Sequence, residues 1–245
     1  MNNGHKSTRP KIQLDNKMLS KLGANLVNCE LRCGGITNDP ESGIIPRGLI
    51  HEPREGSNSC IVIGLNPGKC NIEERKYYLK HGIQYESLKK YFFDDSNLHD
   101  HPYFRKTRDL LNLLGFDGNI LWTDIAKCEC SGKNGTVPVQ TFRVCIDRFL
   151  RQEIKQCVYS TIFALGKTAY NFCALSFPDR YVVGIPHPTG SRGHFIKLQH
   201  SVTAKLAFFK KCLEIRTDEH GLYRAIYLPE EATNLEKPHK LKARS

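Results

Sequence analysis

The sequence predicts an α/β fold, a three-layer α/β/α sandwich around a central, mainly parallel sheet of four strands. Two observations carry this prediction. Short apolar runs rich in β-branched residues recur along the chain, and stretches with helical spacing of apolar residues separate them. Because strands that alternate with helices form parallel sheets, we expect helices on both faces of this sheet.

The expected elements follow the chain in order. The four strands are residues 59–63, 119–125, 159–165 and 181–185. Helical patterns fill most of residues 70–115, ending at Gly115, where a helix C-cap belongs. Apolar residues between 142 and 154 recur at three- and four-residue spacing, which indicates one buried helix face. A short helix at 167–175 and a last core helix at 194–213 complete the pattern.

The chain is expected to form one core domain with appendages, because 245 residues can bury one substantial core. Residues 1–20 are predicted to be a flexible basic arm, and residues 21–213 the core. Residues 214–228 surround the turn sequence Asp218-Glu219-His220-Gly221 and predict a C-terminal β-hairpin. The polar tail, residues 229–245, is predicted to be disordered.

The amino-acid composition limits the classes of partner that we expect for this chain. The chain has 36 Lys and Arg against 25 Asp and Glu, a net charge of +11. Such a charge suits DNA as a partner, although a generally basic soluble protein would look the same. No apolar run approaches the roughly 18 residues of a membrane span, and the polar N-terminus lacks a secretory signal. We therefore expect a cytoplasmic monomer without a membrane partner.

The turn after the first strand is the first candidate site. Gly64-Leu65-Asn66-Pro67-Gly68 lies at the carboxyl end of a strand, where ligands bind in open α/β sheets. Its glycines permit a close approach to a ligand. The glycine spacing fits neither a phosphate-binding P-loop nor a dinucleotide fingerprint. Taken alone, the pentapeptide is equally consistent with a tight structural turn.

A second loop follows the fourth strand and should open on the same edge of the sheet. In it, His187 stands between Pro186 and Pro188, and Ser191 and Arg192 follow. A lone histidine is more often structural than catalytic. Prolines stiffen this loop, however, and its pairing with the first turn makes the arrangement specific.

Together these motifs resemble those of the uracil-DNA glycosylase superfamily, and most closely its iron–sulfur members. The resemblance runs from about residue 29 to residue 213, and it includes His101-Pro102-Tyr103-Phe104, Thr123-Asp124-Ile125-Ala126-Lys127-Cys128 and Phe163-Ala164-Leu165-Gly166. It implies the uracil-DNA glycosylase fold and excision of a flipped base from DNA. The implied catalytic residues are Asn66, which positions water, and His187, which contacts the base O2. The implied base-binding residues are Gly64, Leu65, Tyr103 and Asp124, and the implied DNA contacts are Lys69, Ser191 and Arg192.

Asp124 departs from the family pattern, in which an asparagine reads uracil. A carboxylate only accepts hydrogen bonds, so facing uracil it would oppose O4 unless it were protonated. A cytosine-type base offers an N4 amine that a carboxylate can accept from. The sequence therefore suggests a modified cytosine as well as uracil, in DNA repair or in defence against phage with modified DNA. Alternatively, Asp124 is turned away from the base.

Four of the ten cysteines fall where the iron–sulfur families place cluster ligands, namely Cys29, Cys33, Cys128 and Cys145. The resemblance implies a structural [4Fe–4S] cluster at these positions, with zinc as the alternative metal. Cys130 is an alternative to Cys128, and Cys145 alone would also suit an apolar helix face. The remaining cysteines are interpreted as structural.

The leading functional hypothesis is a monofunctional DNA glycosylase that leaves an abasic site. A non-catalytic DNA-binding module on the same fold is the main alternative, but it would have no need of both Asn66 and His187. An enzyme acting on free nucleosides or nucleotides also fits the fold, and it would leave the basic surface unused.

Overall fold

The computed structural model describes residues 16–94, 97–132, 136–157 and 161–234. Within them the central sheet has six strands in the order β2-β4-β3-β6-β7-β8, and every neighbouring pair is parallel except β2–β4. The strands are β2 (Leu49–Glu52), β3 (Cys60–Gly64), β4 (Ile120–Asp124), β6 (Thr161–Leu165), β7 (Val182–Ile185) and β8 (Ala225–Tyr227).

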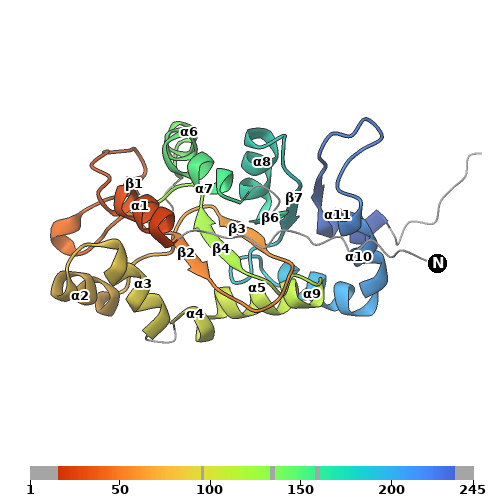
Figure 1. Cartoon of the computed structure of the whole chain (residues 1–245), viewed down its shortest axis with the longest axis horizontal. Helices are drawn as coiled ribbons and strands as arrows, with labels where there is room; N and C mark the ends of the chain where they lie inside the picture. Colours follow the sequence, from red (N-terminus) through yellow and green to blue (C-terminus); the bar gives the residue numbers. More distant parts are fainter. Residues whose placement is uncertain (1–15, 95–96, 133–135, 158–160, 235–245) are drawn as a thin grey trace, which may run out of the picture.

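Helices lie on both sides of this sheet (Figure 1), as the sequence predicts. On one side are α6 (Val139–Cys145), α7 (Arg151–Lys155) and α8 (Lys167–Ser176), and on the other are α5 (Pro102–Leu113) and α9 (His194–Ala204). The remaining helices are α1 (Asn16–Val27), α2 (Ile72–His81), α3 (Tyr85–Asp94), α4 (Asn97–Asp100), α10 (Leu206–Glu214) and α11 (Leu228–Asn234). Two short strands, β1 (Ile36–Thr37) and β5 (Glu129–Cys130), pair with each other. The chain also forms a 3-10 helix, η1 (Pro40–Ser42), and a π-helix, η2 (Ile146–Leu150).

The prediction of four core strands is confirmed by β3, β4, β6 and β7. All residues of these strands are buried, because helices cover both faces of the sheet. The count of four strands is wrong, since β2 and β8 extend the sheet at its two edges. Both are too short for a periodic signal: β2 has four residues in a turn-rich stretch, and β8 has three.

The C-terminal extension, predicted as a β-hairpin, also joins the main sheet. Its arms do meet, at an antiparallel bridge between Thr217 and Tyr223. The second arm then continues into β8, which pairs in parallel with β7. The extension therefore completes one edge of the main sheet.

Two predicted disordered segments are partly helical. Helix α1 begins at Asn16 and buries Leu19, so the prediction of a flexible arm is wrong for residues 16–20. Helix α11 occupies residues 228–234, so the prediction of disorder is wrong for 229–234. Leu228 is fully buried, and an ion pair of 2.6 Å joins Lys167 to Glu230. Residues 1–15 and 235–245 lie outside the described residues. No helix in the described part of the chain is long and apolar enough to cross a membrane.

A buried polar cluster fixes the segment that follows β4. Lys127 Nζ lies 2.8 Å from Glu153 Oε2 on α7, and both side chains are almost fully buried. The Thr123 hydroxyl donates to the same carboxylate at 2.6 Å. Lys127 Nζ also donates to the Thr123 hydroxyl. The carboxyl end of β4 is thereby held against the helical layer at one defined position.

Replacing Glu153 with leucine should destabilise the fold by about 3–5 kcal/mol, because it leaves the buried Lys127 ammonium without its partner. The combined Lys127→Met and Glu153→Leu variant should recover much of this loss, since apolar groups of similar volume replace the pair. Urea unfolding of the two single variants and the double variant measures both effects. A double variant as unstable as the sum of the singles would contradict the interpretation.

Candidate active site

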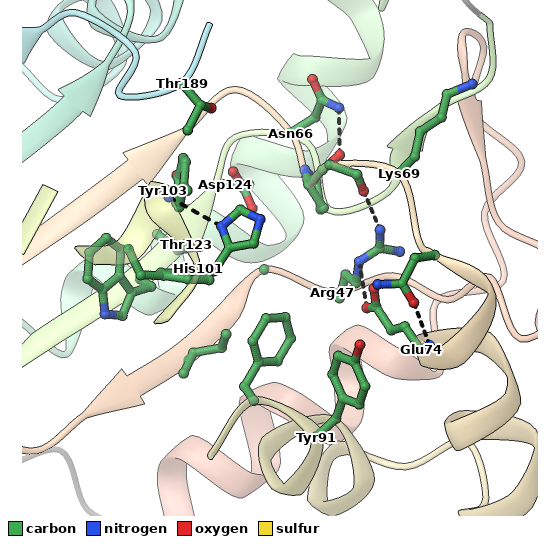
Figure 2. Close-up of a pocket in the computed structure, with 18 of the residues that line it drawn as sticks. Arg47, Asn66, Lys69, Glu74, Tyr91, His101, Tyr103, Thr123, Asp124 and Thr189 are labelled. Atoms are coloured by element: carbon green, nitrogen blue, oxygen red, sulfur yellow. Dashed lines mark hydrogen bonds and ion pairs between the residues drawn. The ribbon is translucent and has the colours of Figure 1, made fainter. Parts of the chain in front are cut away.

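A cavity of about 330 Å³ opens at the carboxyl ends of β3 and β4, a size typical of small-molecule sites. Figure 2 shows its lining. The sequence-predicted residues Asn66, Lys69, Tyr103, Asp124 and His187 all line it. The structure thus brings together residues from the segments after β3, β4 and β7 and from α5.

The other predicted residues lie elsewhere. Gly64 and Leu65 form the strand end behind the cavity, and Ser191 and Arg192 follow His187 outside its lining. The Ser191 hydroxyl accepts a hydrogen bond of 3.0 Å from the Phe195 backbone at the start of α9. Arg192 is exposed, and among the described residues it alone has a positive φ without being glycine, at 49°.

Backbone hydrogen bonds hold the Asn66 turn in place. The carbonyls of Gly64 and Leu65 accept from the backbone N–H groups of Ile125 and Ala126, each at 3.0 Å. The turns after β3 and β4 are therefore joined directly. The Asn66 amide donates to the Pro67 carbonyl at 2.9 Å (Figure 2), and no described residue donates to its Oδ1. This oxygen is left as an acceptor for a ligand or a water molecule.

The environment of His187 determines which ring nitrogen carries the proton. Backbone N–H groups of Thr189 and Gly190 donate to Nδ1 at 3.3 and 3.0 Å. Burial lowers the pKa of His187 below its usual value, so the ring is neutral at neutral pH. Because Nδ1 accepts, the proton of the neutral ring lies on Nε2. His187 can therefore present an uncharged N–H donor.

Tyr103 lies in the first turn of α5, where the His101 ring accepts from its backbone N–H at 3.2 Å. Its ring centroid is 5.5 Å from that of His187, and it packs edge to face on Phe104. Arg108, further along α5, binds Glu52 of β2 through two bonds of 2.8 and 3.1 Å. This pair anchors the helix on the sheet and fixes the position of the Tyr103 ring.

Asp124 ends β4 directly opposite Gly64 of β3, and its side chain lies beside the Tyr103 ring (Figure 2). Only 9% of the residue is exposed. The pKa of its carboxyl is raised to about 7, mainly by burial and in small part by Glu153, against the opposing effects of Lys127 and Arg47. Both protonation states are therefore populated near neutral pH. The alternative in which Asp124 is turned away from the candidate base site does not fit this position.

A charged group at one end of the cavity has no signal in the sequence. Arg47 is buried and pairs with Glu74 at 3.2 Å and with Glu129 at 3.1 Å, and it also donates to the Gly68 carbonyl. Figure 2 shows it beneath the Asn66 turn. A single arginine in a turn-rich stretch carries no pattern that separates it from the many basic residues of the chain. Other lining residues that were missed are Tyr91, Phe92, Asn71, Trp122 and Thr189.

The four predicted cysteine ligands lie near one another. Burial raises the pKa of Cys128 to about 12, and the thiols of Cys145, Cys29 and Cys33 contribute to the increase. Cys29 and Cys33 likewise raise the pKa of Cys145, after burial. Cys128 is therefore close to the other three thiols, and Cys130 remains the alternative ligand from the same segment. No three His, Cys, Asp or Glu side chains of the described residues are already spaced to hold a metal ion.

Comparison of the chain with protein-family models and with curated proteins finds no match. The relationship to uracil-DNA glycosylases is therefore a proposal that depends on motifs and site geometry.

Because Asp124 binds its proton more tightly in the folded chain than in the unfolded chain, its contribution to stability is lost as pH rises from about 4 to about 7. The Asp124→Asn variant lacks this ionisation. Its Tm should exceed that of the wild type at about pH 8, and the difference should shrink toward pH 4. Thermal unfolding across this range measures it, with the exposed Asp109→Asn as control. A constant difference between variant and wild type would contradict the raised pKa.

Proposed function

We propose that this protein is a DNA glycosylase that flips out a pyrimidine base and hydrolyses its N-glycosidic bond, leaving an abasic site. The observation that carries the proposal is the convergence of Asn66, Tyr103, Asp124 and His187, from separate segments, on one cavity. These are the four side chains to which the family resemblance assigns water positioning, base stacking, base reading and contact with O2.

The site chemistry fits departure of the base as an anion. Negative charge would accumulate on the base O2, where the neutral His187 offers its Nε2–H as a donor. The Asn66 Oδ1, which accepts no hydrogen bond from a described residue, would hold the attacking water. An amide is a poor base, so its contribution would be positioning rather than proton abstraction. The Tyr103 ring would stack on the flipped base.

The rim of the cavity would meet the DNA backbone. Lys69 is exposed beside the Asn66 turn, and Arg192 is exposed on the His187 loop. Their exposure on two of the loops that carry site residues, together with the net charge of +11, suits phosphate contacts next to a flipped nucleotide. The Ser191 hydroxyl already caps the start of α9, so its contribution to DNA binding would be mainly to shape this loop.

The cavity suits a modified cytosine or uracil as the excised base. It continues past Asp124 to Arg47, Glu74 and Tyr91, which leaves space beside a pyrimidine ring for a substituent. DNA repair and defence against phage with modified DNA are both compatible with such a base. The alternatives are a non-catalytic DNA-binding module and a nucleoside hydrolase, and incubation with oligonucleotides distinguishes them from a glycosylase.

We further propose that Cys29, Cys33, Cys128 and Cys145 hold a [4Fe–4S] cluster, with zinc as the alternative metal. Their mutual proximity supports this, and so does the Lys127 backbone N–H, which bonds to the Cys145 thiol. Hydrolysis needs no electron transfer, so the cluster would be structural. It would fix the segment before β1 to the segment after β4, and the π-helical turn that begins at Ile146 would set the angle of the Cys145 side chain.

Incubation with oligonucleotides that carry uracil, cytosine or a 5-substituted cytosine should produce alkali-labile abasic sites with at least one of them. The Asn66→Ala and His187→Ala variants should each lose about 100-fold or more in rate, since each removes a group that acts in the transition state. His220→Ala, an exposed histidine outside the cavity, is the matched control. Equal product from the wild type and both site variants would overturn the assignment. Binding without product would favour the non-catalytic module, and cleavage of free nucleosides alone would favour the hydrolase.

Protein purified without oxygen should contain about four iron atoms per chain and absorb visible light. Cys128→Ser should lose iron, whereas Cys130→Ser should retain it, which separates the two candidate ligands. Metal analysis and absorbance spectra measure both. A colourless protein with one zinc ion per chain would show that the cysteines bind zinc instead of a cluster. A metal-free wild type would overturn the proposed metal centre.

A further inference from the structure

The Asp124 carboxyl lies beside two glycines, Gly64 and Gly48. A Cβ added at Gly64 would lie 2.2 Å from Oδ1, and one added at Gly48, where φ is +92°, would lie 2.4 Å from Oδ2. At either position a Cβ would displace the carboxyl, so a glycine at each leaves room for the carboxyl in its present place. No described residue donates a hydrogen bond to either oxygen. The hydrogen-bonding groups of the carboxyl therefore remain available to a ligand.

The nearby cations do not serve the Asp124 carboxyl as partners. Lys127 Nζ is bound to Glu153 at 2.8 Å, and the Arg47 guanidinium is bound to Glu74 and Glu129. An ionised Asp124 would thus be a largely buried anion without a donor among the described residues, which is costly. A neutral carboxyl in the same place carries one donor and one acceptor.

We propose that Asp124 reads the flipped base as a neutral carboxylic acid, with its hydroxyl donating to one atom of the base edge and its carbonyl accepting from the neighbouring one. This inference rests on the proposed glycosylase function. It concerns the form in which Asp124 binds the base.

A neutral acid complements two pyrimidine edges without moving a heavy atom. With cytosine-type bases, the carbonyl accepts from the N4 amine and the hydroxyl donates to N3. With uracil-type bases, the hydroxyl donates to O4 and the carbonyl accepts from N3–H. The two cases differ only in which oxygen of the Asp124 carboxyl carries the proton. Asp124 therefore selects bases with an adjacent donor and acceptor at N3 and C4, and the rest of the cavity distinguishes their substituents.

The surroundings make Asp124 the group that changes charge near neutral pH. The charged and titratable groups around it are Lys127 and Arg47, Glu153 of α7, Tyr103 of α5 and His187 of the loop after β7. Burial raises the pKa of Tyr103 well above its usual value, and the pKa of His187 is lowered. Both stay neutral between about pH 7 and 8.5. Loss of base binding as pH rises through about 7 is then expected from Asp124 alone.

The test combines titration with binding. In protein labelled with ¹³C-aspartate, a carboxyl resonance that is absent from Asp124→Asn should titrate near pH 7. Binding is measured with oligonucleotides carrying 2′-fluoroarabino-uridine or -cytidine, whose glycosidic bonds resist hydrolysis. The wild type should bind both about thirtyfold more weakly at about pH 8.5 than at about pH 6, because the neutral fraction falls by that factor. Asp124→Asn, which has a donor and an acceptor at every pH, should show no such loss.

Each result bears on a separate claim. A resonance that titrates near 4 overturns the neutral acid, even if the protein excises bases efficiently. Wild-type binding independent of pH, or a pH dependence retained in Asp124→Asn, overturns the reading role. Absence of abasic sites with every oligonucleotide overturns the glycosylase function instead, and the titration still decides the protonation state of Asp124. Unmodified duplex binding at both pH values corrects for general DNA affinity.

Discussion

The structure depends most on Lys127, a buried cation with three attachments. Its ammonium is neutralised by Glu153 of α7, its carbonyl accepts from the Arg47 backbone at 2.7 Å, and its N–H bonds to the Cys145 thiol. One residue therefore ties the end of β4 to the helical layer, to the segment before β2 and to the cysteine group. Because buried charges are tolerated only with complete partners, this geometry admits few alternatives. Asp124 and Cys128 stand on either side of this anchor, so the candidate base site and the candidate metal centre share one support.

The ends of the parallel strands position the residues of the site. Parallel strands bring the turns after β3, β4 and β7 to one edge, and the backbone bonds from Ile125 and Ala126 join two of those turns directly. The third turn carries His187, whose Nδ1 is held by backbone N–H groups. Main-chain contacts thus hold the Asn66 turn and orient the His187 ring. Such preorganisation is what electrostatic stabilisation of a departing base requires.

The sequence was sufficient for the central strands and for the residues with a motif, because buried strands form continuous apolar runs and glycine- and proline-bounded turns stand out. It was insufficient where tertiary contacts decide. Strand β8 pairs with β7 across a long stretch of chain, and α11 is held by the buried Leu228 and the Lys167–Glu230 pair. Arg47 lines the cavity because of ion pairs with Glu74 and Glu129, which lie far from it in sequence. No local pattern encodes such pairings.

The interior of the cavity and the exposed surface beside it differ in charge. Its interior groups are neutral or internally paired: His187 is uncharged, Tyr103 stays protonated, and Arg47 is balanced by two carboxylates. Exposed cations stand on the Asn66 turn, where Lys69 lines the cavity, and on the His187 loop, where Arg192 follows the lining residues. A polyanion would be attracted to the rim, while an uncharged base would enter the interior without displacing a counter-ion. An ionised Asp124 would be the exception to this division, and its burial between Gly48 and Gly64 opposes that ionisation. In the neutral form that this burial favours, Asp124 offers both a donor and an acceptor.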